Sequence, residues 1–441
     1  MIVLPEAFKK RMQTQRRDAQ ELFDALDTTA PTSIRINPNK PVKHFLDKAD
    51  VPWCETGFYL EQRPSFTLDP LFHAGAYYPQ EAGSMFIDAV LKKIQVPDDA
   101  VVLDLCAAPG GKSTILLDNL SDNALLVSNE IMRNRAYILR DSLTKWGNSN
   151  VMVTNKSAQD FSQCHGLFDL VLVDAPCSGE GMFRKDLKAR NEWTENNTHI
   201  CAVRQTDILN TIWPTIKEDG YLLYSTCTFN PAENDQQLLQ LLGNLDAEIV
   251  SLDFPNTWGL ESDSVGYSCL PHLMKTEGFF FVLIQKTEAT PNYKIRKNNT
   301  KNRKVVEKND VFPFTLDPKY RPVYLKDAFY QIPESQSEMM LHLNEILGCM
   351  KMGTRLGEVI NRKFNPHFEW ALAKEEPKEF NAYELSLKDA LQFLKGNAID
   401  VLAKDGWNLA TFQGTGLGWF KKIGNRINNY YPKELRIRME L

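Results

Sequence analysis

The sequence predicts an α/β protein whose largest domain is a doubly wound, Rossmann-like sheet, flanked by a small N-terminal α+β domain and a basic C-terminal α+β module. Three observations predict this arrangement. Short apolar runs alternate with helix-length amphipathic stretches from residue 100 onward, which is typical of parallel strands joined by crossover helices. A Gly-rich turn follows the first of these runs, and the balance of charge changes sign near residue 290.

Seven apolar runs mark the expected strands of the central sheet. They are residues 101–105, 124–128, 151–154, 168–173, 221–225, 248–252 and 279–284. Helix-length segments separate the first five, so we expect these strands to be parallel and covered on both faces. The last two runs lie closer together, and we expect them to close the sheet as an antiparallel edge.

The residues before the central sheet predict one helix and one strand. Apolar side chains recur at helical spacing between Phe8 and Leu26, behind Pro5, which predicts a single helix. Residues 33–37 have the pattern of a short strand that ends at a proline. A turn at residues 77–85 then leads into a helix that reaches about residue 93.

The chain of 441 residues is long enough for two or three domains. We expect an N-terminal domain over residues 1–75, the doubly wound core over 76–288, a basic linker over 289–311 and a C-terminal module over 312–441. Residues 290–441 carry 25 Lys and Arg against 18 Asp and Glu, although the whole chain has a net charge of −5. Such a split indicates contact with nucleic acid.

Composition and cysteine usage exclude several classes of protein. With 43% hydrophobic and 24% charged residues, the chain has the composition of a globular protein. It contains no stretch of about 18 apolar residues that would span a membrane. The eight cysteines form no Cys-x-x-Cys pair, so we expect no metal site. The first ten residues lack the pattern of a signal peptide, so we expect a cytoplasmic protein with reduced thiols.

Residues 106–113, Cys-Ala-Ala-Pro-Gly-Gly-Lys-Ser, form a candidate ligand-binding turn between a strand and a helix. Small residues let a ligand approach the backbone, and the helix N-terminus offers free N–H groups. The end of the turn resembles a P-loop, which would indicate an ATPase acting on RNA. A P-loop, however, requires Gly at the position of Cys106, and Pro109 removes an N–H that a phosphate would need.

S-adenosylmethionine fits this turn better than a nucleoside triphosphate does. It carries no phosphate, and it needs an acidic partner for its ribose hydroxyls about 20 residues past the turn. Glu130 lies 20 residues after Gly110, at the end of the next apolar run. Although Glu130 has the ordinary alternative of an exposed loop acid, its spacing favours a role in cofactor binding.

Two further apolar runs end in loops that carry a cysteine. One leads into Asp174-Ala-Pro-Cys177, and the other leads into Thr226-Cys227. Because carboxyl ends of parallel strands meet at one edge of a sheet, we expect both thiols to face the cofactor turn. Free cysteines usually serve packing, and we assign that role to Cys54, Cys106, Cys164, Cys201, Cys269 and Cys349.

A thiol at this place suits methyl transfer to a cytosine ring. Carbon 5 of cytosine is a poor nucleophile, and a thiolate that adds to carbon 6 makes it reactive toward the methyl group of a sulfonium. Asp174 can hydrogen-bond the amino edge of a cytosine that has left its stack. A second thiol nearby can assist release of the product.

Together these motifs resemble the Nop/Sun class of RNA 5-methylcytosine methyltransferases. The resemblance rests on DLCAAPGGKS at 104–113, DAPCSGEGMFRKD at 174–186, YSTCTFNPAEND at 224–235, YYPQEAGSM at 77–85 and RINP at 35–38. It implies a class I methyltransferase core, an RNA-recognition domain over 1–75 and S-adenosylmethionine as cofactor. The C-terminal module resembles the PUA-like RNA-binding module of bacterial 16S rRNA enzymes of the RsmF type.

The resemblance also implies a role for each matching residue. Cys227 would be the nucleophile, Cys177 would serve product release, and Asp174 would hold the base. Cofactor contacts would come from Cys106, Ala107, Ala108, Pro109, Gly110, Gly111, Lys112, Glu130, Arg135, Ser157 and Asp174, with Gln80 as a further match. Family members typically carry an acidic residue that contacts the adenine at the position where this chain has Ser157.

The implied substrate is 16S rRNA or the small ribosomal subunit, bound by a monomer. Candidate phosphate contacts are Lys421, Lys422, Arg426, Lys433, Arg184 and Lys185. Candidate stacking platforms for unpaired bases are Trp407, Trp419, Phe420, Tyr430 and Tyr431. A solvated face and a small aromatic core are the ordinary alternatives. A non-catalytic rRNA-binding assembly factor is the remaining alternative function, and it would be favoured if Cys177, Cys227 or Asp174 were absent.

Overall fold

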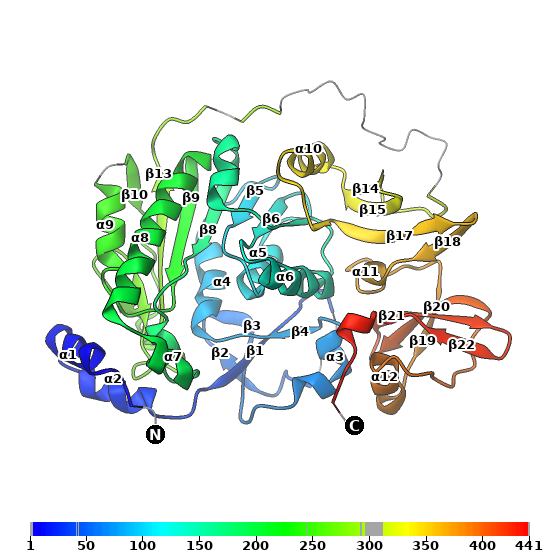
Figure 1. Ribbon diagram of the computed structural model, residues 1–441, viewed down its shortest axis with the longest axis horizontal. Coiled ribbons are helices and arrows are strands. Elements are labelled where there is room, and N and C mark those ends of the chain that lie inside the picture. Colours follow the sequence, from blue (N-terminus) through cyan, green and yellow to red (C-terminus); the bar gives the residue numbers. More distant parts are fainter. Residues whose placement is uncertain are drawn as a thin grey trace.

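The computed structural model describes residues 3–40, 42, 44–243, 245–291, 293–295 and 312–439. Most of the expected linker at 289–311 lies outside these residues. The described part has a central sheet, an N-terminal sheet beside it and two further sheets in the C-terminal third (Figure 1). No helix among the described residues is long and apolar enough to cross a membrane.

The central sheet contains the strands that the apolar runs predict. Its order is β11-β12-β13-β9-β8-β5-β6-β7-β16, with β10 paired to β13. The bounds are β5 Val101–Asp104, β6 Leu125–Asn129, β7 Val151–Thr154, β8 Phe168–Asp174, β9 Ile216–Thr226, β10 Ala247–Ile249, β11 Glu261–Ser262, β12 Tyr267–Cys269, β13 Phe279–Lys286 and β16 Lys351–Met352. Strands β5 to β9 are parallel, and β10 and β13 form the predicted antiparallel edge.

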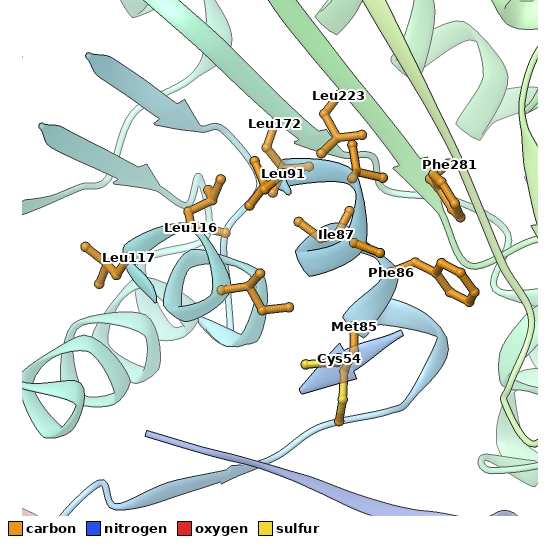
Figure 2. Packing of buried hydrophobic residues seen from close by; sticks show 14 of the residues in the cluster. Cys54, Met85, Phe86, Ile87, Leu91, Leu116, Leu117, Leu172, Leu223 and Phe281 are labelled. Carbon is orange, nitrogen blue, oxygen red and sulfur yellow. The ribbon is translucent and has the colours of Figure 1, made fainter. Parts of the chain in front are cut away.

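Helices cover both faces of this sheet, as continuous apolar strands require. One face packs against α4 Phe86–Leu91, α5 Gly111–Asn119 and α6 Arg133–Trp146; the other packs against α8 Glu195–Ile212, α9 Asp235–Leu242 and α10 Ser337–Leu347. Figure 2 shows Phe86 and Ile87 of α4 beside Leu223 and Phe281 of the sheet. The short helix α7 Leu187–Glu192 follows the loop after β8.

The N-terminal prediction of a single helix is wrong, because the segment folds as two. Helix α1 spans Glu6–Gln15 and α2 spans Ala19–Leu26. Arg16 between them has an extended backbone, and its guanidinium bonds both Asp18 and Glu261. Glu261 is 245 residues away in the chain, so the break depends on a tertiary contact.

A four-stranded sheet of order β2-β3-β1-β4 follows these two helices. It contains the predicted strand as β1 Thr32–Ile36, together with β2 Ala49–Val51, β3 Cys54–Leu60 and β4 Tyr77–Pro79, and α3 Pro70–His73. Buried side chains of this sheet and of α3 share one core with the C-terminal third, where Ile34, Leu71 and Tyr77 belong to the same cluster as Phe393 and Tyr431. The N-terminal sheet therefore joins the two ends of the chain.

The C-terminal third contains two four-stranded sheets. The first has β14 Tyr320–Leu325, β15 Ala328–Pro333, β17 Thr354–Ile360 and β18 Lys363–Pro366; the second has β19 Asn381–Glu384, β20 Gly406–Phe412, β21 Thr415–Ile423 and β22 Arg426–Asn429. Helices α11 Phe368–Ala371 and α12 Leu387–Leu394 accompany them. Strand β16, from this same region, extends the central sheet by pairing antiparallel with β7.

Candidate active site

The cofactor turn lies between β5 and α5, as predicted. Gly110 has φ +115° and precedes the first residue of α5. This left-handed conformation favours glycine, and a Cβ at Gly110 would come within 3.0 Å of Ser142 Cβ. The N–H of Ala107 donates to the Asn129 carbonyl at 2.8 Å, which holds the turn against the end of β6.

The chemistry of this turn fits S-adenosylmethionine. Ser113 donates to Asp104 Oδ2 at 2.6 Å, whereas the buried Asp104 Oδ1 has no protein partner among the described residues. Burial raises the pKa of Asp104 to about 7. The turn thus combines a free acceptor, an approachable backbone and the N–H groups of a helix terminus.

Glu130 and Arg135 lie together at the same edge of the sheet. Glu130 follows the last residue of β6 and is only 3% exposed, and its Oε1 accepts from the Met132 N–H at 2.9 Å. Arg135 Nη1 lies 3.3 Å from Glu130 Oε2, and Arg135 Nη2 donates to the Ala108 carbonyl at 2.7 Å. Arg135 therefore connects the predicted ribose acid to the cofactor turn.

Ser157 and Gln80 border this region in different ways. Ser157 follows β7, and its hydroxyl donates to Asp160 at 2.7 Å in a capping box. Where family members typically carry an acidic residue, this chain therefore has a serine whose hydroxyl contacts the carboxylate of Asp160, three positions later. Gln80 is buried, accepts from Arg35 Nε at 3.0 Å and packs against Gly111, where a Cβ would lie 3.3 Å from Gln80 Nε2.

Lys112 links the cofactor turn to the cysteine loops. Its Nζ lies 2.8 Å from Asp174 Oδ2 and 5.1 Å from the centroid of the Phe279 ring. Burial alone would lower the pKa of Lys112, but the Asp174 carboxylate outweighs burial and raises it, so Lys112 is an ammonium. Asp174 Oδ1 accepts from the Ser225 hydroxyl at 2.9 Å. The lysine that suggested a P-loop is therefore paired with a carboxylate.

The two predicted thiols lie side by side. Cys177 follows the end of β8 and Cys227 follows the end of β9, and their Sγ atoms are 3.2 Å apart. The hydrogen bond with Cys227 and burial both raise the pKa of Cys177 well above its ordinary value. The contact places a second thiol directly beside Cys227, which the motif resemblance makes the candidate nucleophile.

Several residues that support this site carried no assignment in the sequence. Glu180, fully buried three residues after Cys177, accepts from both terminal nitrogens of Arg11 at 2.9 and 2.7 Å and from Trp193 Nε1 at 3.0 Å. Glu233 and Asn234 lie beside the Cys227 loop. Glu180 and Glu233 lie within the cysteine-containing motifs at 174–186 and 224–235, so the sequence offered a signal for both. Nothing near Arg11 in the sequence points to the site.

The predicted RNA contacts are partly wrong. Arg184 is nearly buried and pairs with Glu277 at 2.9 Å, so it serves the fold. Trp419, Phe420 and Tyr431 are at most 2% exposed and belong to the core. In contrast, Lys185, Arg426 and Lys433 are exposed, Lys421 and Lys422 are half-buried, and Trp407 and Tyr430 pack together with ring centroids 4.4 Å apart.

The other cysteines and the acidic residues define no further centre. Cys54, Cys164, Cys201 and Cys269 are buried, Cys106 and Cys349 are half-buried, and all six are free. Within the described ranges, no group of three or more His, Cys, Asp or Glu side chains is arranged to hold a metal ion.

Three sequence families match the chain in order. The N-terminal domain of 16S rRNA methyltransferase RsmF matches residues 4–82, 16S rRNA methyltransferase RsmB/F matches 92–285, and the methyltransferase RsmF PUA domain matches 380–437. The PUA match covers the sheet that contains β20 and β21.

Similar proteins agree with these matches. The ribosomal RNA small subunit methyltransferase F of Shewanella loihica is 31% identical over 87% of this chain and 83% of its own length. Among solved structures, a methyltransferase homologue from Pyrococcus horikoshii is 27% identical, with a TM-score of 0.53 over 61% of this chain and 91% of its own. NSun6 from the same organism, solved with SFG, shares the fold at 17% identity, with a TM-score of 0.55 over 64% of this chain and 98% of its own.

The enzyme of the same name from Erwinia tasmaniensis is similar to the chain from end to end. It is 30% identical over 98% of this chain and 97% of its own length. This similarity, the three family matches in order and the methyltransferase fold with its paired thiols lead to one conclusion: the chain belongs to the RsmF family of 16S rRNA methyltransferases.

Proposed function

We propose that this rRNA methyltransferase methylates carbon 5 of a cytosine in 16S rRNA, with S-adenosylmethionine as the donor and Cys227 as a transient covalent partner of the base. The observation that carries the proposal is the 3.2 Å separation of Cys177 and Cys227 at the strand ends that also hold Asp174. A site for simple packing would not need two thiols and an ion-paired carboxylate at the edge where the cofactor turn lies.

The first step is attack on the ring by Cys227. Its sulfur bonds to carbon 6 of a cytosine that has left its stack, which moves electron density to carbon 5. Asp174 accepts a hydrogen bond from the exocyclic amino group, and Lys112, 2.8 Å from Asp174, orients that carboxylate. S-adenosylmethionine would supply the methyl group that carbon 5 takes.

The second step releases the methylated base. Water takes the proton from carbon 5, the electron pair of that C–H bond restores the double bond between carbons 5 and 6, and the bond between carbon 6 and sulfur breaks, so that Cys227 leaves as a thiolate. Cys177 acts at this step, because its sulfur lies beside Cys227 and its raised pKa keeps it protonated. Its proton can stabilise the departing thiolate by a hydrogen bond.

The cofactor is held by the turn of residues 106–112 together with Glu130, Arg135 and Ser157. Glu130 is the candidate acceptor for the ribose hydroxyls, because its carboxylate is almost completely buried at the end of β6. The free Asp104 Oδ1 is a candidate acceptor for a ligand N–H. An ATPase is disfavoured, because the Lys112 ammonium that would meet phosphates is paired with Asp174.

The N-terminal domain and the C-terminal module would hold the rRNA. Relatives of this chain are named for the small-subunit rRNA on which they act, and its PUA match places a known type of RNA-binding domain at its C-terminal end. We infer a cytoplasmic enzyme that acts as a monomer on 16S rRNA or on the small subunit. A silent assembly factor is disfavoured by the complete set of Cys177, Cys227 and Asp174.

Bisulfite mapping of 16S rRNA tests this function directly. Cells that carry the gene are expected to show a protected cytosine that disappears when the gene is deleted. The protection should return with the intact gene and not with a Cys227→Ala variant. An identical bisulfite pattern in all four strains would overturn the proposal.

A further inference from the structure

Asn234 ties together the residues on either side of Cys227. The Thr226 hydroxyl donates to Asn234 Oδ1 at 2.6 Å, and Asn234 Nδ2 donates to the Thr228 carbonyl at 3.0 Å. Asn234 is only 4% exposed. One side chain therefore holds the hydroxyl of the residue immediately before the proposed nucleophile and the backbone carbonyl of the residue immediately after it.

Glu233, the preceding residue, does the same for the Cys177 loop. Its Oε1 accepts from the Ser178 N–H at 2.8 Å, and its Oε2 accepts from the Ser178 hydroxyl at 2.5 Å. Gln205 of α8 donates both to Glu233 Oε1 at 3.3 Å and to the Pro176 carbonyl at 3.0 Å. The residues before and after Cys177 are thus held through one carboxylate.

The two loops are also connected to each other through this carboxylate. Thr228 Oγ1 donates to Glu233 Oε2 at 3.3 Å and lies 3.0 Å from Ser178 Oγ. The Tyr224 hydroxyl donates to the backbone carbonyl of Glu233 at 2.7 Å, which fixes Glu233 and the adjoining Asn234 to β9. Glu233 and Tyr224 are fully buried, and both Glu233 carboxylate oxygens and the Tyr224 hydroxyl are bonded within the protein, so neither side chain is available to bind RNA or cofactor.

We propose that Glu233 and Asn234 are paired positioning residues, in which Glu233 sets the Cys177 loop, Asn234 sets the Cys227 loop, and their adjacency in the chain fixes the distance between the two thiols. The consequences of this positioning for catalysis rest on the function proposed above. Reactions that depend on the position of a group by about 1 Å can lose roughly 100-fold in rate when that position is lost.

A disulfide assay measures the thiol geometry without any methylation. Treatment with diamide, which takes two hydrogen atoms from a pair of thiols, should link Cys177 and Cys227, and mass spectrometry of peptides follows the rate. Because two sulfur atoms react only when held close together, Glu233→Ala and Asn234→Ala should each slow the linkage about tenfold or more. Glu369→Ala, which removes a carboxylate paired with Lys351 in the C-terminal third, is the matched control and should leave the rate unchanged.

Conservative variants keep this test valid if an alanine variant does not fold. Glu233→Gln retains an acceptor for the Ser178 N–H, and the hydroxyls of Ser178 and Thr228 can turn to accept from its amide, so it should stay within about threefold of the native rate. Asn234→Asp places a second acceptor opposite the Thr228 carbonyl, and it should slow the linkage as alanine does. Ser178→Ala, which removes the hydroxyl that donates to Glu233 Oε2, should also slow the linkage. Unchanged rates in Asn234→Asp and in Ser178→Ala would overturn the proposal.

Single-turnover methylation of 16S rRNA separates the two roles. Asn234→Ala should slow formation of the protein–RNA adduct, whereas Glu233→Ala should let the adduct form and slow its release. KM for RNA should not change, because both side chains are buried. Equal effects of the two variants on both steps would overturn the assignment of one residue to each loop. If disulfide rates fall as expected while no variant and no native protein forms an adduct, the positioning role stands and the covalent chemistry fails.

Discussion

At the scale of single residues, side chains of the same chemical type differ in their partners and their burial. Of the two thiols 3.2 Å apart, Cys177 has a pKa raised by its bond to Cys227 and by burial. Among the carboxylates, Asp174 pairs with an ammonium, whereas Asp104 is buried with one oxygen free and a pKa raised to about 7. These differences suit distinct roles in attack, release, base recognition and cofactor binding.

Replacing Asp174 with Asn should abolish most methyl transfer without loss of RNA binding. The variant keeps the shape of the side chain but loses the negative charge that pairs with Lys112 and strengthens the hydrogen bond from the base. The expected loss in kcat is about 100-fold or more, as for other preorganised charge contacts at reacting centres. Tritiated-methyl transfer measures the rate and filter binding measures the affinity. A fall in affinity equal to the fall in rate would contradict a role in chemistry.

His73 should make the fold sensitive to acid. Burial lowers the pKa of His73 to about 4, its Nε2 bonds the Thr67 carbonyl at 2.9 Å, and its buried Nδ1 has no partner in the described part of the chain. Because the unfolded histidine titrates near 6.5, the unfolded state binds more protons between pH 6.5 and 4, and stability falls as pH drops through that window.

Thermal melts between pH 7 and 4.5 test this sensitivity. His73→Gln keeps an N–H for Thr67 but cannot take up a proton, so its melting temperature should fall less steeply with acid than that of the native protein. The exposed His199 provides a control, since His199→Gln should retain the native slope. Equal slopes in all three proteins would contradict the assignment.

At the scale of elements, one buried lysine joins the ends of three helices. Lys40 Nζ donates to the carbonyls of Ala74, Lys145 and Leu372 at 2.6, 2.5 and 2.9 Å, which lie at the C-terminal ends of α3, α6 and α11. Helix C-termini carry partial negative charge, which favours an ammonium there and opposes the lowering of its pKa to about 7 by burial. The N-terminal sheet, the core and the C-terminal third meet at this point.

Lys40→Met should therefore destabilise the protein strongly. Methionine fills the same space but leaves three buried carbonyls without their donor, and the expected loss is about 3 kcal/mol or more. Denaturant unfolding measures it. Lys48→Met, at a partly exposed lysine, should change the free energy of unfolding by less than about 0.5 kcal/mol. Similar small effects in both variants would show that the three-helix junction does not depend on Lys40.

At the scale of the whole molecule, distant segments of the chain complete the site and its surroundings. Helices α1 and α2 pack on Phe183 and Trp193 beyond the Cys177 loop, and Arg11 bonds Glu180 within it. At the other edge of the sheet, β16 brings the C-terminal third against β7. The N-terminal helices and the C-terminal third therefore both contact segments of the methyltransferase core (Figure 1).

RNA affinity should depend steeply on salt, because phosphate contacts release counterions. Exposed Arg426 and Lys433 are the best single candidates in the C-terminal module, and replacing either by Ala should lower the slope of log affinity against log salt by about 1. Titrations of 16S rRNA fragments at several salt concentrations measure this slope. A flat response in the native protein would remove the basic module from the account.

Sequence predicted the strands, the turn and the paired thiols because each is signalled locally. Continuous apolar runs mark β5 to β9, and motif residues follow the strand ends directly. The misses share a different cause. At the break between α1 and α2, Arg16 bonds Glu261. Arg184 is buried in an ion pair with Glu277, and the two-residue strand β16 is defined by its pairing with β7. Each depends on a partner far away in the chain, which no local pattern reveals.

The most direct test of the central claim is a denaturing gel of Cys177→Ala incubated with 16S rRNA and S-adenosylmethionine. Attack by Cys227 should proceed while release stalls, so a covalent protein–RNA band should accumulate that the native enzyme shows only faintly. The band should vanish in the Cys177→Ala, Cys227→Ala double variant. A Cys177→Ala protein that turns over normally with no such band, or a band that persists without Cys227, would contradict the account.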